Sequence, residues 1–552
     1  MRASVLATIL LLTLVAAPVE AQVVGDCEPG TAERDLDVND VLARVFNGGN
    51  LFFGNTTVAG DGYLVPKSTG HSPIFAGDLW VGGLVDGEIR AAGSTYSNFP
   101  FAPGPLDADG NPPKDCSQYD RIYRVSRGDV ARYHETGEAT DDLRDWPADL
   151  GAPVLDGDGV AGNYNLAGGD EPAISGEQML WWVMNDVGTV DLLDRTPLSI
   201  EVQASAFAVP STVPALNQAT LYRFEIIYRG EQPLDSTYIA FWKDIDLGDA
   251  ADDFIGTDTT LDMSFAYNGD EVDATYGVPP AVGTKLLRGP IGLPNGRDDD
   301  EDGTVDEADE RLGVTASSCY FDAPVFTPPA ERYYNCLQGR WFSGEPMIEF
   351  EFGFPFGDDV EGDTTTIAFP GDPVTGQFWS EENADGEGNP NFPADRWYSL
   401  SSGPFRLEPG DTEEVVFAIP FAQGADRLDS VVKLREAARY LQRAYDLGLF
   451  EPERVRPAPT EPPPPQDFAL RAFPNPFGSS ASVELTVADG AGPLRLAVYD
   501  VLGREVAVLA DGVLAPGTYP FTLDGAGLPA GVYFVRLATG RQTVSLTLVH
   551  ID

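Results

Sequence analysis

Basic residues are scarce in this sequence, and only five of them are lysines. The chain has 35 lysines and arginines against 87 aspartates and glutamates, which gives a formal net charge of −52. A surface of this sign repels nucleic acid and anionic membranes, so neither is expected as a partner. Concentrated salt would screen such self-repulsion, but acidity also keeps an ordinary secreted protein soluble. The sequence leaves both explanations open.

Histidines and the common catalytic motifs are also scarce. The three histidines are His71, His134 and His550, and the chain has no H-E-x-x-H, no G-x-S-x-G and no glycine-rich phosphate loop. No catalytic residue is therefore identified, and whether the protein is an enzyme stays open. Because carboxylates are so abundant, the rival hypothesis is an extracellular glycoside hydrolase, or another polysaccharide-degrading enzyme, that uses acidic residues.

Only one long apolar run occurs, and it lies at the start of the chain. Arg2 precedes the apolar segment Val5–Ala17, and the small-x-small site Val19–Ala21 follows it. This order predicts a signal peptide over residues 1–21, with an exported mature chain starting near Gln22. No later run is long enough to predict a membrane span.

Cysteine is rare but even in number. Cys27, Cys116, Cys319 and Cys336 follow the predicted signal peptide, so an oxidising compartment allows two disulfides with three connectivities. No C-x-x-C spacing occurs, which disfavours a metal site. Cys319–Cys336 closes the shorter loop and is the expected pair.

Residues 22–450 contain short strand-like runs separated by Gly, Pro, Asp and Asn. Period-two alternation rich in Val, Ile, Phe and Tyr predicts a mainly β, sandwich-type body of one or two sandwiches, with an acidic insertion at about 290–340. One amphipathic helix is expected at its end, because apolar residues recur every three or four positions between Asp426 and Gly448. Examples of the strand-like runs are SIEVQASAFAV, ATLYRFEIIYRG and EEVVFAIPFA.

A proline-rich stretch separates the body from the C-terminal part. Prolines concentrate in residues 451–467, which predicts a stiff, exposed linker. Residues 468–552 again alternate apolar and polar side chains between glycine turns. This pattern predicts a small immunoglobulin-like β-sandwich.

Four sequence blocks make this tail specific. They are FPNPF at 473–477, VYDVLGREV at 498–506, LAPGTYPF at 514–521 and LPAGVYFVRL at 528–537. In this order and spacing they resemble the type A C-terminal sorting domain of type IX secretion substrates of Bacteroidetes and their relatives. The matching positions are Pro474, Asn475, Pro476, Tyr499, Asp500, Gly503, Gly531, Tyr533 and Arg536.

The resemblance implies a route and a location. It implies export through the type IX secretion machinery, removal of the tail by a surface sortase, and release or attachment to surface lipopolysaccharide or another polysaccharide. One departure is the ending His550–Asp552, since many members end in a basic, apolar strand. Segments of the body, such as GDLWVGG, GEQMLWWVMND and SGPFRLEPGD, are similar to large secreted proteins of the same bacteria, which implies a location but no activity.

The acidic insertion carries the spacing of a calcium loop. Carboxylates and a carbonyl fall at positions 1, 3, 5, 7, 9 and 12, and Gly303 stands at the turn position 6. Hard oxygen ligands at this spacing predict a structural calcium ion, although position 12 is aspartate instead of the usual glutamate. The expected ligands are Asp298, Asp300, Asp302, Thr304, Asp306 and Asp309.

A second, weaker calcium candidate follows a predicted strand at WKDID. Its expected ligands are Asp244, Asp246, Asp249 and Asp252. The shorter DADG at 107–110 and DGDG at 156–159 are interpreted as Asp-Gly turns. The sequence therefore predicts a secreted or surface-attached protein with a calcium-stabilised, non-catalytic structural or binding body.

Overall fold

The structure is a computed structural model of the chain. It describes residues 27–53, 62–96, 100–189, 196–294, 296, 309–321, 329–355, 362–454, 468–487, 493–500, 504–515, 517–539 and 543–551. The predicted signal peptide, most of the predicted linker and most of the predicted calcium loop therefore lie outside the described residues.

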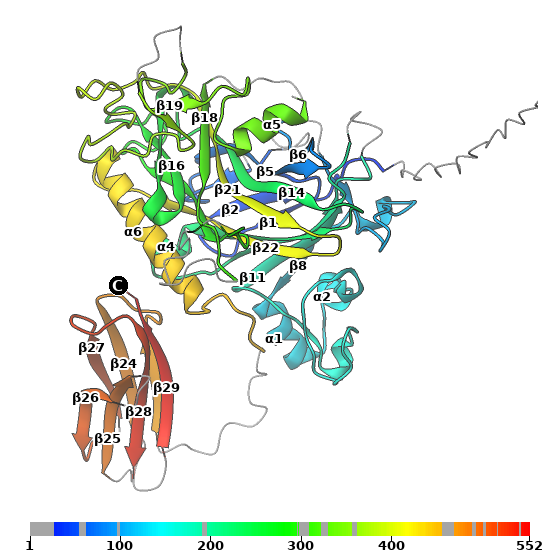
Figure 1. Ribbon diagram of the computed structural model, residues 1–552. Coiled ribbons are helices and arrows are strands. Elements are labelled where there is room, and N and C mark those ends of the chain that lie inside the picture. Colours follow the sequence, from blue (N-terminus) through cyan, green and yellow to red (C-terminus); the bar gives the residue numbers. More distant parts are fainter. Residues whose placement is uncertain are drawn as a thin grey trace, which may run out of the picture.

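Two nine-stranded antiparallel sheets form the body (Figure 1). Across the first sheet, the strands are β1 (Glu33–Leu36), β2 (Leu42–Phe46), β3 (Asn50–Leu51), β5 (Ile74–Val85), β14 (Leu234–Ile245), β21 (Arg396–Leu407) and β18 (Ala316–Phe321), with β4 (Tyr63–Leu64) beside β2 and β6 (Glu88–Ala92) beside β5.

Across the second sheet, the strands are β15 (Asp253–Asp258), β16 (Met263–Asn268), β17 (Ala281–Arg288), β22 (Thr412–Ala422), β13 (Ala219–Tyr228), β12 (Ile200–Ala208), β11 (Gln178–Asn185) and β7 (Ala102–Pro103), with β8 (Tyr123–Ser126) beside β11. Two short pairs stand apart from both sheets: β9 (Val154–Leu155) with β10 (Glu171–Pro172), and β19 (Met347–Ile348) with β20 (Thr364–Thr365).

The main core lies between these two sheets. Phe241 of β14 contacts Phe224 of β13 and Phe417 of β22, with ring centroids 6.0 and 5.3 Å apart. Adjacent strand residues face opposite ways, so Trp182 joins this core while Trp181 packs in a separate cluster on the other face. The prediction of a mainly β, sandwich-type body is confirmed.

The helices cover the outer faces of the sandwich. α6 contacts β17 and β22 of the second sheet, and α5 contacts β5 and β18 of the first. The α-helices are α1 (Arg127–Thr136), α2 (Asp141–Arg144), α4 (Pro214–Asn217), α5 (Ala330–Leu337) and α6 (Arg427–Asp446), and the 3-10 turns are η1 (Ser117–Tyr119), η2 (Ala148–Leu150), η3 (Leu166–Gly168), η4 (Ala250–Asp252) and η5 (Thr259–Leu261).

Helix α6 is the helix that the sequence predicts. The Asp426 side chain accepts hydrogen bonds from the backbone N–H groups of Leu428 and Asp429, and Gly448 takes a positive φ just beyond the end. Helices α1 and α5 were not predicted from the sequence. A capping box between Ser126 and Asp129 starts α1 and was a readable signal for it.

The tail is a second two-sheet sandwich with its own core, and its Val549 and Ile551 also join a cluster of the body that contains Leu441 (Figure 1). Seven strands in two sheets confirm the immunoglobulin-like prediction. One sheet contains β23 (Phe468–Phe473), β24 (Ser480–Val487) and β27 (Gly517–Asp524), and the other contains β26 (Glu505–Gly512), β25 (Leu494–Asp500), β28 (Gly531–Thr539) and β29 (Thr543–His550).

The expected disulfide is wrong. The structure joins Cys27 to Cys116, whose Cα atoms lie 5.6 Å apart, and leaves Cys319 and Cys336 as buried free thiols. Cys319 faces the core between the sheets, whereas Cys336 lies in the cluster under α5 on the other face of the first sheet. A short loop in sequence therefore does not bring these two sulfur atoms together.

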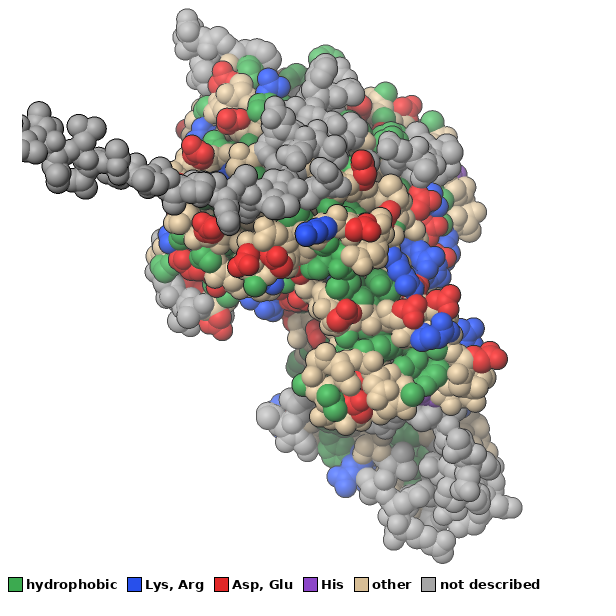
Figure 2. All heavy atoms as spheres, turned by 90° about the vertical axis from the view of Figure 1, so that its right-hand side faces the viewer, with side chains coloured by type: hydrophobic (Ala, Val, Ile, Leu, Met, Phe, Trp, Pro, Cys, Tyr) green, Lys and Arg blue, Asp and Glu red, His purple; other side chains and the backbone are tan. Residues whose placement is uncertain are grey.

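The surface matches the composition. Figure 2 shows acidic side chains scattered over one face of the body among small groups of basic ones. Among the described residues, no helix combines the length and the apolar character needed to cross a membrane.

Lys243 of β14 is a basic residue whose side chain is buried in the main core instead of lying on the surface. The side chain is fully buried, and its Nζ lies 2.8 Å from the centroid of the Phe241 ring without a hydrogen bond to any described group. Burial holds the pKa of Lys243 well below its usual value, opposed by the carboxylate of Asp78.

We expect Lys243→Met to stabilise the protein, since folding no longer removes an ammonium group from water. The gain in the free energy of unfolding should be about 1–4 kcal/mol near neutral pH. It should shrink as the pH rises toward about 10.4, where the unfolded chain also loses the proton. Urea unfolding at several pH values measures it. The exposed Lys433→Met is the control, and a destabilised Lys243→Met would contradict the interpretation.

Candidate functional site

The opening block of the tail holds the last strand. The Asn475 amide donates to the backbone oxygen of Thr547 at 3.0 Å, and its side-chain oxygen accepts from the Val549 N–H at 2.8 Å. The backbone of Phe477 continues this pairing, donating to Val549 and accepting from Ile551. The opening block and the final strand β29, which are distant in sequence, are therefore one structural unit, with Pro474 and Pro476 flanking Asn475.

The remaining matched positions support turns and the tail core. The buried Tyr533 donates its hydroxyl hydrogen bond to the backbone oxygen of Pro529, and Gly531 before it has a φ of 154°. Asp500 accepts from the Arg504 backbone N–H at 2.9 Å, and Gly503 lies outside the described residues. Tyr499 donates to Glu505 at 3.1 Å.

Arg536 differs from these residues because its side chain is exposed. It lies on β28 opposite Ala497 and has no ion pair with any described residue. Among the described motif residues, Arg536 is thus the one whose charge is presented to solvent instead of being used to hold the tail together.

In the body, three carboxylates meet where β14 ends and β21 begins. Ile245 pairs with Arg396, so Asp246 and Asp395 lie beside each other at the next position. Asp244 shares the face of Asp246, because side chains two residues apart in a strand point the same way. One carboxylate oxygen from each of Asp244, Asp246 and Asp395 lies within 4.8 Å of the other two.

Burial and mutual repulsion disfavour the charged forms of this acidic triplet. Burial, followed by the charges of Asp395 and Asp246, raises the pKa of Asp244 to about 8, although a 2.7 Å hydrogen bond from the Tyr96 hydroxyl opposes the shift. Burial and Asp395 raise the pKa of Asp246 to about 6. A cation among these oxygens would relieve the repulsion, and hard carboxylate oxygens suit calcium or magnesium.

Aromatic side chains make the wall beside the acidic triplet. Trp242 precedes Asp244 by two residues, and Trp397 follows Asp395 by two residues. Because side chains two residues apart in a strand point the same way, both tryptophans lie on the face of the sheet that carries the triplet. Trp80 stacks on Trp242 and Tyr320 stacks on Trp397, with centroids 5.6 and 4.2 Å apart. The three tryptophans are fully buried, so they support the triplet and do not offer a sugar-stacking surface.

The structure divides the second predicted calcium set between two places. Asp244 and Asp246 enter the acidic triplet, whereas Asp249 and Asp252 belong to a neighbouring acidic group with Asp270 and Asp273. Burial and these neighbours raise the pKa of Asp252 to about 6. Asp395 was not predicted as part of this site, because nothing in the sequence shows that its strand β21 pairs with β14.

The first predicted calcium site, the loop from Asp298 to Asp309, lies almost wholly outside the described residues. Asp298, Asp300, Asp302, Thr304 and Asp306 lie outside the described residues, and Asp309 is exposed at their edge.

The DGDG segment does form a turn, but the turn is closed by a distant aspartate. Asp170 accepts hydrogen bonds from the backbone N–H groups of Gly157, Asp158 and Asn165. Asp156, Asp158 and Asp170 therefore also converge, within 4.8 Å. Because three backbone N–H groups already donate to Asp170, we interpret this group as one that holds the loop together.

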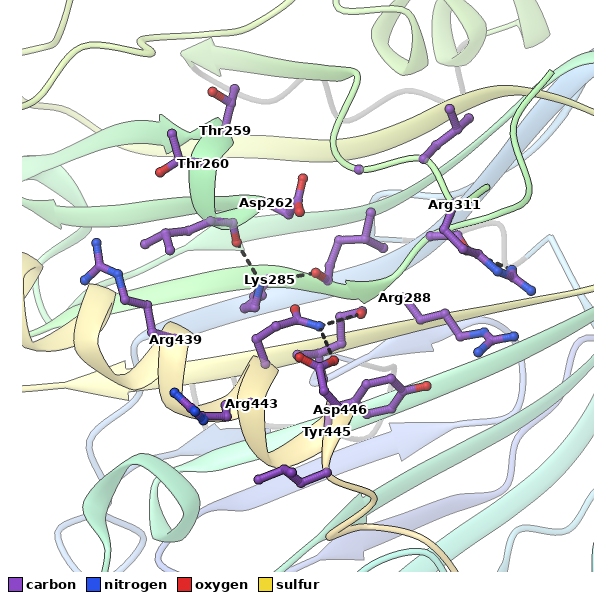
Figure 3. A pocket seen from close by; sticks show the side chains of 18 residues that line it. Thr259, Thr260, Asp262, Lys285, Arg288, Arg311, Arg439, Arg443, Tyr445 and Asp446 are labelled. Carbon is purple, nitrogen blue, oxygen red and sulfur yellow. Dashed lines mark hydrogen bonds between the residues drawn. The ribbon is translucent and has the colours of Figure 1, made fainter. Parts of the chain in front are cut away.

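A groove in the body lies between α6, β17, η5 and residues 311–313 (Figure 3). Its volume is about 890 Å³. Lys285 points into the middle of the groove, Arg439 and Arg443 extend from α6 at one end, and Arg288 and Arg311 lie at the other. Asp262 and Asp446 are its two acidic lining residues.

Comparison with known families identifies the tail. Residues 471–551 match the model of the secretion system C-terminal sorting domain. The C-terminal unit is thus a type IX sorting domain, and the protein is a secreted, surface-attached protein exported by that system. No curated protein is similar enough in sequence to count as a relative.

Solved structures show only weak likeness to the whole chain. A polysaccharide lyase shares 9% identity over 64% of this chain and 34% of its own, with a TM-score of 0.19. Dimeric latent PorU from Porphyromonas gingivalis shares 10% sequence identity over 60% of this chain and 24% of its own, with a TM-score of 0.13. PorZ, a surface component of the type IX system of the same organism, shares 9% sequence identity over 70% of this chain and 45% of its own, with a TM-score of 0.12. The chain spans about a third of the lyase, and these values carry no functional argument.

We expect Asn475→Ala to release the last strand of the tail, because Val549 and Thr547 both lose their partner. The local cost should be about 1–3 kcal/mol. Hydrogen exchange of the C-terminal peptide, followed by mass spectrometry, should show faster exchange at Val549. The exposed Arg536→Ala should leave this exchange unchanged. Equal exchange in Asn475→Ala and the parent chain would show that the two hydrogen bonds from Asn475, here called the clasp, do not hold the last strand.

Proposed function

We propose that the body is a calcium-stabilised, non-catalytic structural or binding module that the sorting domain delivers to the cell surface. The observation that carries the proposal is the acidic triplet, in which three aspartates converge at the end of two central strands. A cation there would tie β14 to β21 at the point where their pairing begins. Removal of the tail by a sortase, and attachment to lipopolysaccharide or another polysaccharide, belong to the same proposal.

The chemistry of the triplet supports calcium. It supplies only hard oxygen donors, and its raised pKa values show that the ionised form is unfavourable without a compensating positive charge. Asp244 and Asp246 would hold the ion from β14, and the exposed Asp395 would hold it from the solvent side. The loop from Asp298 to Asp309 is proposed as a second site on its sequence spacing alone.

The rival is a polysaccharide-degrading enzyme. A carboxylate pair that cleaves a glycosidic bond has to flank a sugar ring. Asp244 is 6% exposed and accepts a hydrogen bond from the Tyr96 hydroxyl, so it has little surface to offer a sugar ring. These observations favour the ion-binding role. Incubation with polysaccharides should release no new reducing ends, and a release that Asp246→Asn abolishes would favour the enzyme.

We expect calcium to raise the melting temperature, and its effect to grow with pH. Without a cation, the raised pKa values of Asp244 and Asp246 mean that the contribution of these two groups to stability is fully present below about pH 4, the range of unfolded aspartate, and is lost as the pH rises toward about 8. Calcium at a hundredfold excess over its dissociation constant would add about 2.7 kcal/mol to the free energy of unfolding.

Scanning fluorimetry at pH 5 and pH 8, with calcium or with a chelator, measures this difference. Asp246→Asn should reduce the calcium-induced shift, whereas Asp109→Asn, an exposed turn residue, should not. An equal shift in Asp246→Asn and the parent chain would place the ion elsewhere.

We also expect the surface form to lack the tail. Mass spectrometry of protein recovered from cells should give a chain that starts near Gln22 and ends within residues 451–467. A chain that still carries β29 would show that the tail remains part of the working molecule.

A further inference from the structure

The last strand of the tail carries two buried apolar side chains that do not belong to the tail core. In β29, Leu548 lies opposite Tyr533 and joins the core of the tail. Because side chains alternate along a strand, Val549 faces away from that core. Val549 is nevertheless only 8% exposed, and Ile551 is inaccessible to solvent. Groups outside the tail core therefore cover both residues.

The body supplies this cover. Val549 and Ile551 belong to a hydrophobic cluster that contains Leu441 and Ala444 of α6 and Phe450 just beyond the helix. Figure 1 shows the tail beyond the end of α6, and the C-terminus of the chain lies at the end of the tail that is nearest this helix. We call this the tail contact. It joins the last residues of the tail to the last helix of the body.

The tail contact depends on a folded tail. The Val549 N–H donates to the Asn475 side chain at 2.8 Å, and the Ile551 N–H donates to the backbone oxygen of Phe477 at 3.0 Å. These bonds fix the backbone of both residues against the opening block of the tail. An unfolded tail lacks this arrangement and does not present the two side chains together. The contact therefore forms only after the tail has closed its own sandwich.

So small a contact can persist because the two parts share one chain. Two apolar side chains would not hold separate proteins together, since a stable interface buries many more residues. The linker of residues 451–467 makes docking an intramolecular step, with an effective concentration in the millimolar range. Cleavage of the linker removes this advantage. The tail contact is thus suited to hold in the intact chain and to end when the chain is cut.

We propose that the folded tail is a removable cover for the end of α6. Val549 and Ile551 shield the apolar side chains of this region, and removal of the tail exposes those side chains to solvent. The inference rests on the proposed removal of the tail, and it gives the tail a role in the structure of the body besides its role as a sorting domain. It requires no bound ion and no ligand.

Hydrogen exchange of the full chain, followed by mass spectrometry, tests the inference. Val549→Asp places a charge in the tail contact, so peptides from residues 441–450 should exchange at least about tenfold faster than in the parent chain. Peptides from β25 should exchange as before, because Val549 faces away from the tail core. Val508→Asp is the matched control, since Val508 is 46% exposed on β26 of the same tail and should leave residues 441–450 unchanged.

A second variant disturbs the contact without changing its side chains. Asn475→Ala frees the last strand, so it should also speed exchange at residues 441–450. Unchanged exchange there in Val549→Asp would overturn the inference, whether or not the tail had opened, because either change uncovers the end of α6. Faster exchange in Val508→Asp would overturn it too, since that charge lies outside the contact. A surface protein that keeps β29 would instead refute the removal of the tail, and with it the uncovering of α6, even where the exchange results confirm the contact.

Discussion

The fold depends on one strand, β14, that is buried on both faces. From Ile239 to Ile245 every residue is buried, so each side chain has to suit one of two apolar environments. Phe241 faces the core between the sheets, and Trp242 faces the aromatic cluster under α5. Because strand side chains alternate strictly, a shift of one residue in register would exchange these two faces. The pairing with β5 and β21 is therefore tightly specified.

The acidic triplet is a direct result of the same alternation. Asp244 continues the face of Trp242 at the point where the strand leaves the core, and the register with β21 sets Asp395 opposite Asp246. Packing thus determines where the carboxylates lie, and electrostatics determines whether their protonated or their ionised form is favoured. A similar arrangement holds deeper in the protein, where Arg396 pairs with Glu381 at 2.9 Å and both side chains are inaccessible to solvent. Arginine suits such a position because its planar fork satisfies several acceptors at once.

The sequence predicted what local periodicity determines and missed what depends on distant pairing. Alternation identified the sandwich, and the stripe between Asp426 and Gly448 identified α6 together with its cap. The Cys319–Cys336 pair failed because loop length says nothing about which face of a sheet each sulfur occupies, whereas the other two cysteines, Cys27 and Cys116, are paired. Asp395 and the groove beside α6 could not be predicted from the sequence either. The acidic triplet and the groove are each built from segments that lie far apart in the chain. The four tail blocks were predictive for a different reason, because they are a family pattern. What each block does in the fold depends on contacts between strands far apart in the tail, such as the bonds of Asn475 to β29.

The clasp in the tail also bears on how that domain acquires its structure. The bond between Asn475 and the Val549 N–H spans 74 positions, nearly the whole domain, so it cannot form early from local contacts. Closing so long a loop is entropically costly and slow compared with forming a hairpin. A tail whose final strand is not yet available therefore stays open at its first block. The bonds of Asn475 make completion of the tail fold depend on its last strand, so a tail that lacks β29 would leave the opening block without its partner.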